Sequence, residues 1–90
     1  MKRVEVTVRG LVQGVGFRAF VRREAEAGGI AGYVENRLDG SVHALLAGEA
    51  DAISRTIEAI RTGPPGSRVT ECTVSDSDEI PDTGRFVVRR

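Results

Sequence analysis

A segment near the N-terminus combines the residue types of an anion-binding loop. Residues 10–18, GLVQGVGFR, contain three glycines before an arginine. Glycines allow the positive φ angles at which successive backbone N–H groups point into one concavity. A helix that begins at the end of the loop adds unpaired N–H donors and the positive end of its dipole. The guanidinium of Arg18 presents forked donors that match phosphate oxygens. The segment therefore predicts a site for a phosphate-like oxyanion.

The same loop also has a purely structural interpretation. A tight strand-to-helix turn needs glycines for its geometry alone, and Arg18 would then be an ordinary solvated side chain. The loop also differs from two common nucleotide-binding loops. No Gly-Lys-Ser/Thr follows it, and no GxGxxG pattern of a Rossmann unit surrounds it. Short glycine motifs are weak signals, so the elements around the loop have to be considered.

Hydrophobic periodicity predicts a strand before the loop and a helix after it. Residues 3–9 alternate strictly, with valine at every second position, as in a half-buried strand. From Phe17 the period becomes that of a helix, and the glycine pair at 28–29 ends it. The apolar stripe of this helix consists of Phe17, Phe20, Val21 and Ala25.

The rest of the chain predicts four more strands and a second helix. The pair Asp39-Gly40 is typical of a hairpin turn, and the GPPG run at 63–66 stops the second helix. Strands are expected at 30–37, 41–48, 67–75 and 85–89, and the helix at 49–61 with Ala50, Ile53, Ile57 and Ile60 on its apolar face. The strand at 67–75 is expected to carry Thr70, Cys72 and Val74 on one face and Val69 on the other.

This element order, β-α-β-β-α-β with a short terminal strand, predicts one domain over residues 1–90. Two amphipathic helices must cover one face of a mostly antiparallel sheet of four to five strands, which is an α+β, ferredoxin-like split βαβ sandwich. The expected order of the core strands is 4-1-3-2, and the position of the fifth strand stays open. The fold hosts many unrelated activities, so it does not define a function.

Several motifs together resemble the acylphosphatase family. They are VRGLVQGVGFR at 8–18, GYVEN at 32–36 with Gly40, Val42 and Gly48 after it, GPP at 63–65 and the final RFVVRR. The resemblance spans essentially the whole chain and implies hydrolysis of acyl phosphates to a carboxylate and inorganic phosphate. It implies that Asn36 positions the attacking water. It also implies that the phosphoryl group is held by Gln13, Gly14, Val15, Gly16, Phe17 and Arg18.

Glu35 departs from the pattern of the family, whose members usually have a basic or amide residue there. Alternation along the strand points Glu35 away from Asn36, so the site is expected to survive. The chemistry agrees with the resemblance, because a carboxylate leaving group, whose acid has a pKa of about 4–5, departs without a general acid. Phosphoryl transfer then needs positioning and charge stabilisation, and we expect no cofactor and no metal ion.

Composition limits the partners and the location. The 90 residues contain 13 Lys and Arg and 13 Asp and Glu, and this zero net charge argues against nucleic acid as a partner. No apolar run approaches the roughly 18 residues of a membrane span. A single cysteine and the lack of an apolar leader favour the cytoplasm. We expect a monomer that binds a small-molecule acyl phosphate, with inorganic phosphate or sulfate as competing anions.

Four other features have ordinary structural interpretations. His43 is expected to be a surface or half-buried strand residue, since no Ser or Cys motif accompanies it. Cys72 is expected to be a small core residue. Residues 76–84, with Asp76, Asp78, Glu79 and Asp82, are expected to form a solvated acidic loop without the pattern of a calcium site. Arg22 and Arg23 are expected on the solvated side of the first helix, where they would affect mainly the salt dependence of binding.

Two alternatives to an enzyme stay open at this point. In the first, the same loop holds a phosphate or carbamoyl phosphate in a binding module without turnover. In the second, the domain is a regulatory module that recognises a small metabolite or a partner. Turnover of a simple aryl acyl phosphate would distinguish the enzyme from both.

Overall fold

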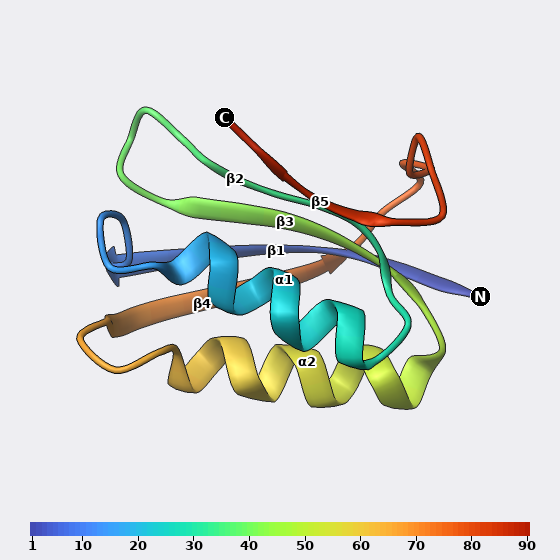
Figure 1. The fold of residues 1–90 in the computed structure, drawn as a ribbon, viewed down its shortest axis with the longest axis horizontal. Helices are drawn as coiled ribbons and strands as arrows, with labels where there is room; N and C mark the ends of the chain where they lie inside the picture. The colour runs from blue at the N-terminus through green and yellow to red at the C-terminus, as the bar shows by residue number, and fades with distance from the viewer.

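A computed structural model describes all 90 residues and contains seven regular elements, as the periodicity predicts. The element types and their order agree with the sequence prediction, and the boundaries differ by one or two residues at most ends. In chain order the elements are β1 (Lys2–Leu11), α1 (Phe17–Ala27), β2 (Ala31–Asn36), β3 (Val42–Gly48), α2 (Ala50–Thr62), β4 (Arg68–Asp76) and β5 (Phe86–Arg89) (Figure 1).

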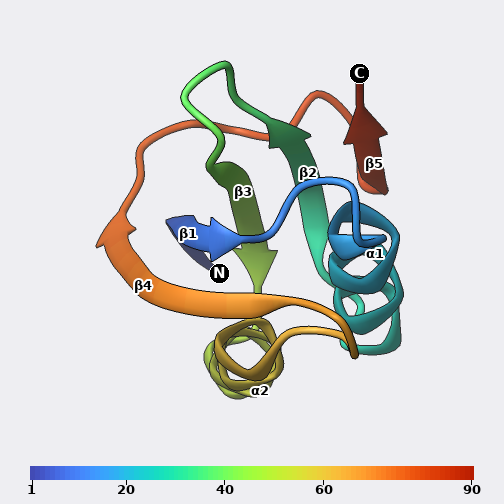
Figure 2. The ribbon, with the colours of Figure 1, turned by 90° about the vertical axis from the view of Figure 1, so that its left-hand side faces the viewer.

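The five strands form one sheet in the order β4-β1-β3-β2-β5. The expected core order 4-1-3-2 is therefore confirmed, and the fifth strand lies outside β2. Every neighbouring pair is antiparallel except β2 and β5, which run parallel. The chain reaches this far edge through the connection after β4, which crosses from one side of the sheet to the other (Figure 2).

Both helices pack on the same face of the sheet, which confirms the two-layer α+β sandwich (Figure 2). Alternating valines of β1 and the apolar stripes of the helices bury their side chains between the layers. None of the helices has the length and apolarity that crossing a bilayer requires. The core consists of Val4, Val6, Val8, Val12, Phe17, Val21, Ala25, Ile30, Val34, Val42, Ala44, Leu46, Ala52, Ile53, Ile60 and Phe86.

A β-bulge corrects the predicted faces of β4. The register between β1 and β4 shifts between Arg9 and Gly10, so that Thr70 has no partner in β1. The extra residue reverses the alternation, and Val69 therefore packs against the core on the same side as Cys72 and Val74. Thr70 is exposed, and its hydroxyl donates to the carbonyl of Arg9 at 3.2 Å.

The predicted apolar face of α2 also needs one correction. Ala50 is exposed in the first turn, whereas Ala52 and Thr56 are buried beside Ile53 and Ile60. The hydroxyl of Thr56 is satisfied locally, by donating to the carbonyl of Ala52 at 2.9 Å. A threonine can therefore lie in the core here without an unpaired polar group.

Candidate active site

The loop between β1 and α1 has the backbone of an anion-binding turn. Gly14 and Gly16 both have φ of 76°, in the left-handed region that side chains disfavour. Gly16 is the N-cap of α1, and no acidic side chain lies in the first turn of that helix. The N–H groups at this end therefore combine with the positive end of the helix dipole without a carboxylate that would compete with an anion.

Arg18 lies in the first turn of α1 and is oriented by the C-terminal strand. Its Nη1 donates to the carbonyl oxygen of Arg89 at 2.7 Å, and the side chain is half-buried. A guanidinium has five N–H donors, so one can hold β5 while others remain for a ligand. The orientation of Arg18 therefore depends on a strand that is 71 residues away in the chain.

Gln13 connects the loop to the turn between β2 and β3. Its Nε2 donates to the carbonyl of Arg37 at 2.8 Å and to that of Ser41 at 2.9 Å. Asp39 closes the same turn, since its Oδ1 accepts from the hydroxyl and the backbone N–H of Ser41. These bonds, with Arg9 nearby, lower the pKa of Asp39 to about 2. Asn36, the last residue of β2, therefore lies at the start of a turn that is hydrogen-bonded to the loop between β1 and α1.

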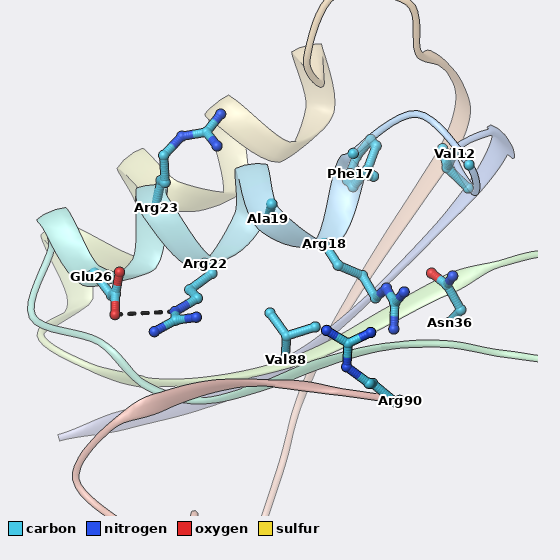
Figure 3. Close-up of a pocket in the computed structure, with 12 residues that line it drawn as sticks. Val12, Phe17, Arg18, Ala19, Arg22, Arg23, Glu26, Asn36, Val88 and Arg90 are labelled. Atoms are coloured by element: carbon cyan, nitrogen blue, oxygen red, sulfur yellow. Dashed lines mark hydrogen bonds and ion pairs between the residues drawn. The ribbon is translucent and has the colours of Figure 1, made fainter.

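Arg18 and Asn36 line the same open cleft, whose volume is about 510 Å³. Their side chains converge at one end of it, beneath the start of α1 (Figure 3). Of the loop residues named from the sequence, Gly14, Gly16 and Phe17 also line the cleft, whereas Gln13 and Val15 do not. The lining residues are Val12, Gly14, Gly16, Phe17, Arg18, Ala19, Arg22, Arg23, Glu26, Asn36, Val88 and Arg90.

Three arginines that the sequence analysis did not place in a site also line this cleft. Arg22 and Arg23 are exposed, as expected, but the cleft runs along them. Arg90 arrives through the parallel pairing of β5 with β2, which sets Arg89 opposite Glu35 and thus brings Arg90 alongside Asn36. The motif RFVVRR contains Arg90, but the position of the fifth strand was open, so the motif could not indicate that Arg90 lines the cleft.

Glu35 points away from the cleft, in agreement with the alternation of β2. Its carboxylate lies 3.6 Å from Nε of Arg37 and 3.6 Å from Nη1 of Arg89, on the face of the sheet without helices. Arg89 also stacks over the ring of Tyr33, 3.5 Å from its centroid. The negative charge of Glu35 is therefore paired with two arginines on the face of the sheet opposite the cleft.

The expected position of His43 is wrong, because its ring is buried. The connection after β4 covers this face: Ser77 donates to Glu5 at 2.7 Å, and Tyr33 donates to Glu79 at 2.9 Å. Nδ1 of His43 lies 3.0 Å from the hydroxyl of Thr7, and Nε2 lies 3.2 Å from the Glu5 carboxylate without hydrogen-bond geometry. His43 is 3% exposed and does not line the cleft that contains Arg18 and Asn36.

Burial makes His43 a source of pH-dependent stability. Burial lowers the pKa of the imidazole, and the positive charge of Arg37 lowers it further. Together these two effects outweigh the opposite effect of the nearby carboxylates of Glu5, Glu35 and Glu79. The unfolded chain, with a histidine pKa of about 6.5, takes up the proton first, so stability is full above that pH and falls as pH decreases below it. Replacing His43 by glutamine is expected to remove this loss.

Denaturant unfolding of both proteins between pH 8 and pH 5 tests the expectation. The stability of the wild type should decline relative to that of His43→Gln as the pH decreases. A constant difference between the two over this range would show that burial does not shift the titration of His43.

Two other expectations from the sequence concern cysteine and the acidic stretch. Cys72 is half-buried and packs against the core, and burial raises the pKa of its thiol. A thiol with a raised pKa is a poor nucleophile at neutral pH. No group of three or more His, Cys, Asp or Glu side chains is arranged to hold a metal ion.

The fold is that of a small ferredoxin-like domain, and its cleft lies between a glycine loop and an arginine. The chain belongs to the acylphosphatase family, whose family model, "Acylphosphatase", matches residues 4–88. It is 45% identical to the acylphosphatase of Methanocella arvoryzae over 99% of this chain and 100% of that protein. It is 41% identical to the acylphosphatase of Bacillus subtilis over 98% of this chain and 97% of that protein.

Solved structures agree with this assignment. The crystal structure of the Bacillus subtilis acylphosphatase superimposes with a TM-score of 0.94 at 40% identity and covers all of both chains. Full-length HypF, in a phosphate- and nucleotide-bound form, matches with a TM-score of 0.89 at 29% identity, over 99% of this chain and 12% of that one. The prediction of an enzyme that hydrolyses acyl phosphates is confirmed.

Proposed function

We propose that the loop amides and Arg18 hold the phosphoryl group while Asn36 orients the attacking water. The convergence of Arg18 and Asn36 at one end of the cleft carries this proposal. The guanidinium and the N–H groups at the start of α1 supply positive charge where the phosphoryl oxygens lie. Amides have no useful basicity, so Asn36 acts as a hydrogen-bond anchor, and a substrate phosphate oxygen takes the water's proton.

Gln13 and the backbone of β5 help to position Asn36 and Arg18. The side chain of Gln13 donates to two carbonyls of the β2–β3 turn and so holds the turn that follows Asn36, which leaves its backbone N–H for the anion. The leaving carboxylate departs unprotonated, and Arg18 with the amides provides the charge stabilisation, so the step uses no metal ion or other cofactor.

We also propose that the protein acts as a monomer in the cytoplasm. Its most exposed large apolar side chains come from five separate segments and are Met1, Leu11, Leu38, Ile80 and Val87. Scattered apolar residues are normal for a monomeric surface. A single, unpaired cysteine suits a reducing compartment.

Inorganic phosphate tests the anion site directly. We expect phosphate or sulfate to inhibit hydrolysis of benzoyl phosphate competitively and to raise the melting temperature. Phosphate at about 100 times its dissociation constant should add about 2.7 kcal/mol to the free energy of unfolding. If millimolar phosphate neither inhibits the reaction nor stabilises the fold, the anion site lies elsewhere.

A further inference from the structure

The cleft continues beyond the phosphoryl position, along α1 and the edge strand β5. A second cavity of about 680 Å³ adjoins it and shares four lining residues with it. The two cavities together form one groove, large enough for a substantial organic group in addition to the phosphoryl group. The shared residues are Arg22, Glu26, Val88 and Arg90.

This groove has a strong excess of positive charge. Five arginines line it, against one acidic side chain, that of Glu26. The whole chain has zero net charge, so the excess is local. Apart from the pair of Arg22 with Glu26, none of the groove arginines forms an ion pair. The five are Arg18, Arg22, Arg23, Arg85 and Arg90.

The side chains follow one another along the groove. In the view of Figure 3, Val88 lies between Arg22 and Arg90, with Arg18 on the Arg90 side, whereas Arg23 turns away toward α2. Nε of Arg22 lies 3.3 Å from the carboxylate of Glu26, one helical turn further along α1. An acyl group attached to a phosphoryl group at Arg18 therefore passes over Val88 and approaches Arg22.

We propose that the groove selects acyl phosphates whose acyl group carries a second negative charge, which Arg22 receives on the far side of Val88. The inference rests on the proposed phosphoryl position at Arg18. Val88 offers an apolar contact to the hydrocarbon part of the acyl group. Glu26 holds Arg22 in place and offsets part of its charge, so Arg22 and Glu26 affect the remote anion in opposite directions.

Two aryl acyl phosphates that differ in one group test the inference. Benzoyl phosphate and 4-carboxybenzoyl phosphate have the same ring, and only the second carries a remote carboxylate. The ratio of their kcat/KM values measures the preference. At low ionic strength we expect the wild type to favour the carboxylated substrate about fivefold, the upper range for a solvent-exposed ion pair, and to lose this preference in high salt.

Three variants separate a local contact from the general field of the protein. Arg22→Gln is expected to bring the ratio close to one, and Glu26→Gln to raise it above the wild-type value. Arg55→Gln removes the same charge from an exposed position on α2 outside the groove, so the ratio should stay at the wild-type value. Melting temperatures show whether each variant remains folded.

A wild-type ratio near one would overturn the inference, and so would an equal decrease in Arg22→Gln and Arg55→Gln. Failure of the proposed phosphoryl site is a separate result. It would appear as benzoyl phosphate hydrolysis that phosphate does not inhibit, whereas failure of the inference alone leaves that inhibition intact.

Discussion

Replacing Asn36 by alanine is expected to lower kcat for benzoyl phosphate by about 10²–10³ and to leave phosphate affinity nearly unchanged. A decrease in kcat of this size is expected when an enzyme loses one hydrogen-bonding group that acts in the transition state. The amide is proposed to contact only the water, so its removal takes away an interaction that bound phosphate does not use. Asn36 is exposed at the end of β2, outside the apolar core, so the variant should stay folded.

Steady-state kinetics and calorimetric titration with phosphate on the same protein test this expectation. Leu38→Ala is the matched control, because Leu38 is fully exposed two residues further on and does not line the cleft. A loss of phosphate affinity in Asn36→Ala would make Asn36 a phosphate ligand. Full activity in that variant would contradict its role in catalysis.

Replacing Arg18 by alanine is expected to damage both binding and turnover. The guanidinium is proposed to contact the phosphoryl oxygens before and during the reaction, so phosphate affinity should decrease by about 10–100-fold, as for lost hydrogen bonds to a charged group. Because charge on the phosphoryl oxygens is also stabilised in the transition state, kcat should decrease by about 10³-fold or more.

Arg18→Lys is expected to recover little of this loss. One donor of Arg18 is committed to the carbonyl of Arg89, and the ligand needs the remaining donors of a planar fork. An ammonium group keeps the charge but cannot serve both partners with the same geometry.

The same two measurements on Arg55→Ala, an exposed arginine of α2, correct for the loss of one positive charge. If Arg18→Lys had wild-type kcat and phosphate affinity, a point charge would suffice and the bidentate role would be wrong. If Arg18→Ala kept its phosphate affinity, the loop amides alone would hold the anion.

The comparison with relatives and the geometry of the cleft support different parts of this account. Family membership over residues 4–88 gives the reaction, hydrolysis of acyl phosphates. The cleft adds which side chains can meet a substrate, and it contains three arginines to which the sequence assigned no role in a site, Arg22, Arg23 and Arg90. The Arg22→Gln variant tests one of these residues separately from the reaction itself.

Local features of this protein were predictable from its sequence, because neighbouring residues decide them. The glycines at 14 and 16 and the start of a helix at Phe17 define, within a few residues, the turn that is proposed to bind the anion. The alternation of β1 and the stripe of α1 set which face each buries. The order of the four core strands followed from the element order, since split βαβ units have few ways to cover one face of a sheet.

The tertiary structure alone decided how distant segments complete the site. Four residues of β5 carry too little pattern to show which edge they join, and the burial of Phe86 against α1 and β2 is a long-range effect. That placement brings the carbonyl of Arg89 to Arg18 and sets Arg90 beside Asn36. The burial of His43 is also a long-range effect, because the segment that covers it follows β4, more than thirty residues away in the chain. The hydrophobic periodicity around His43 does not show that this segment covers it.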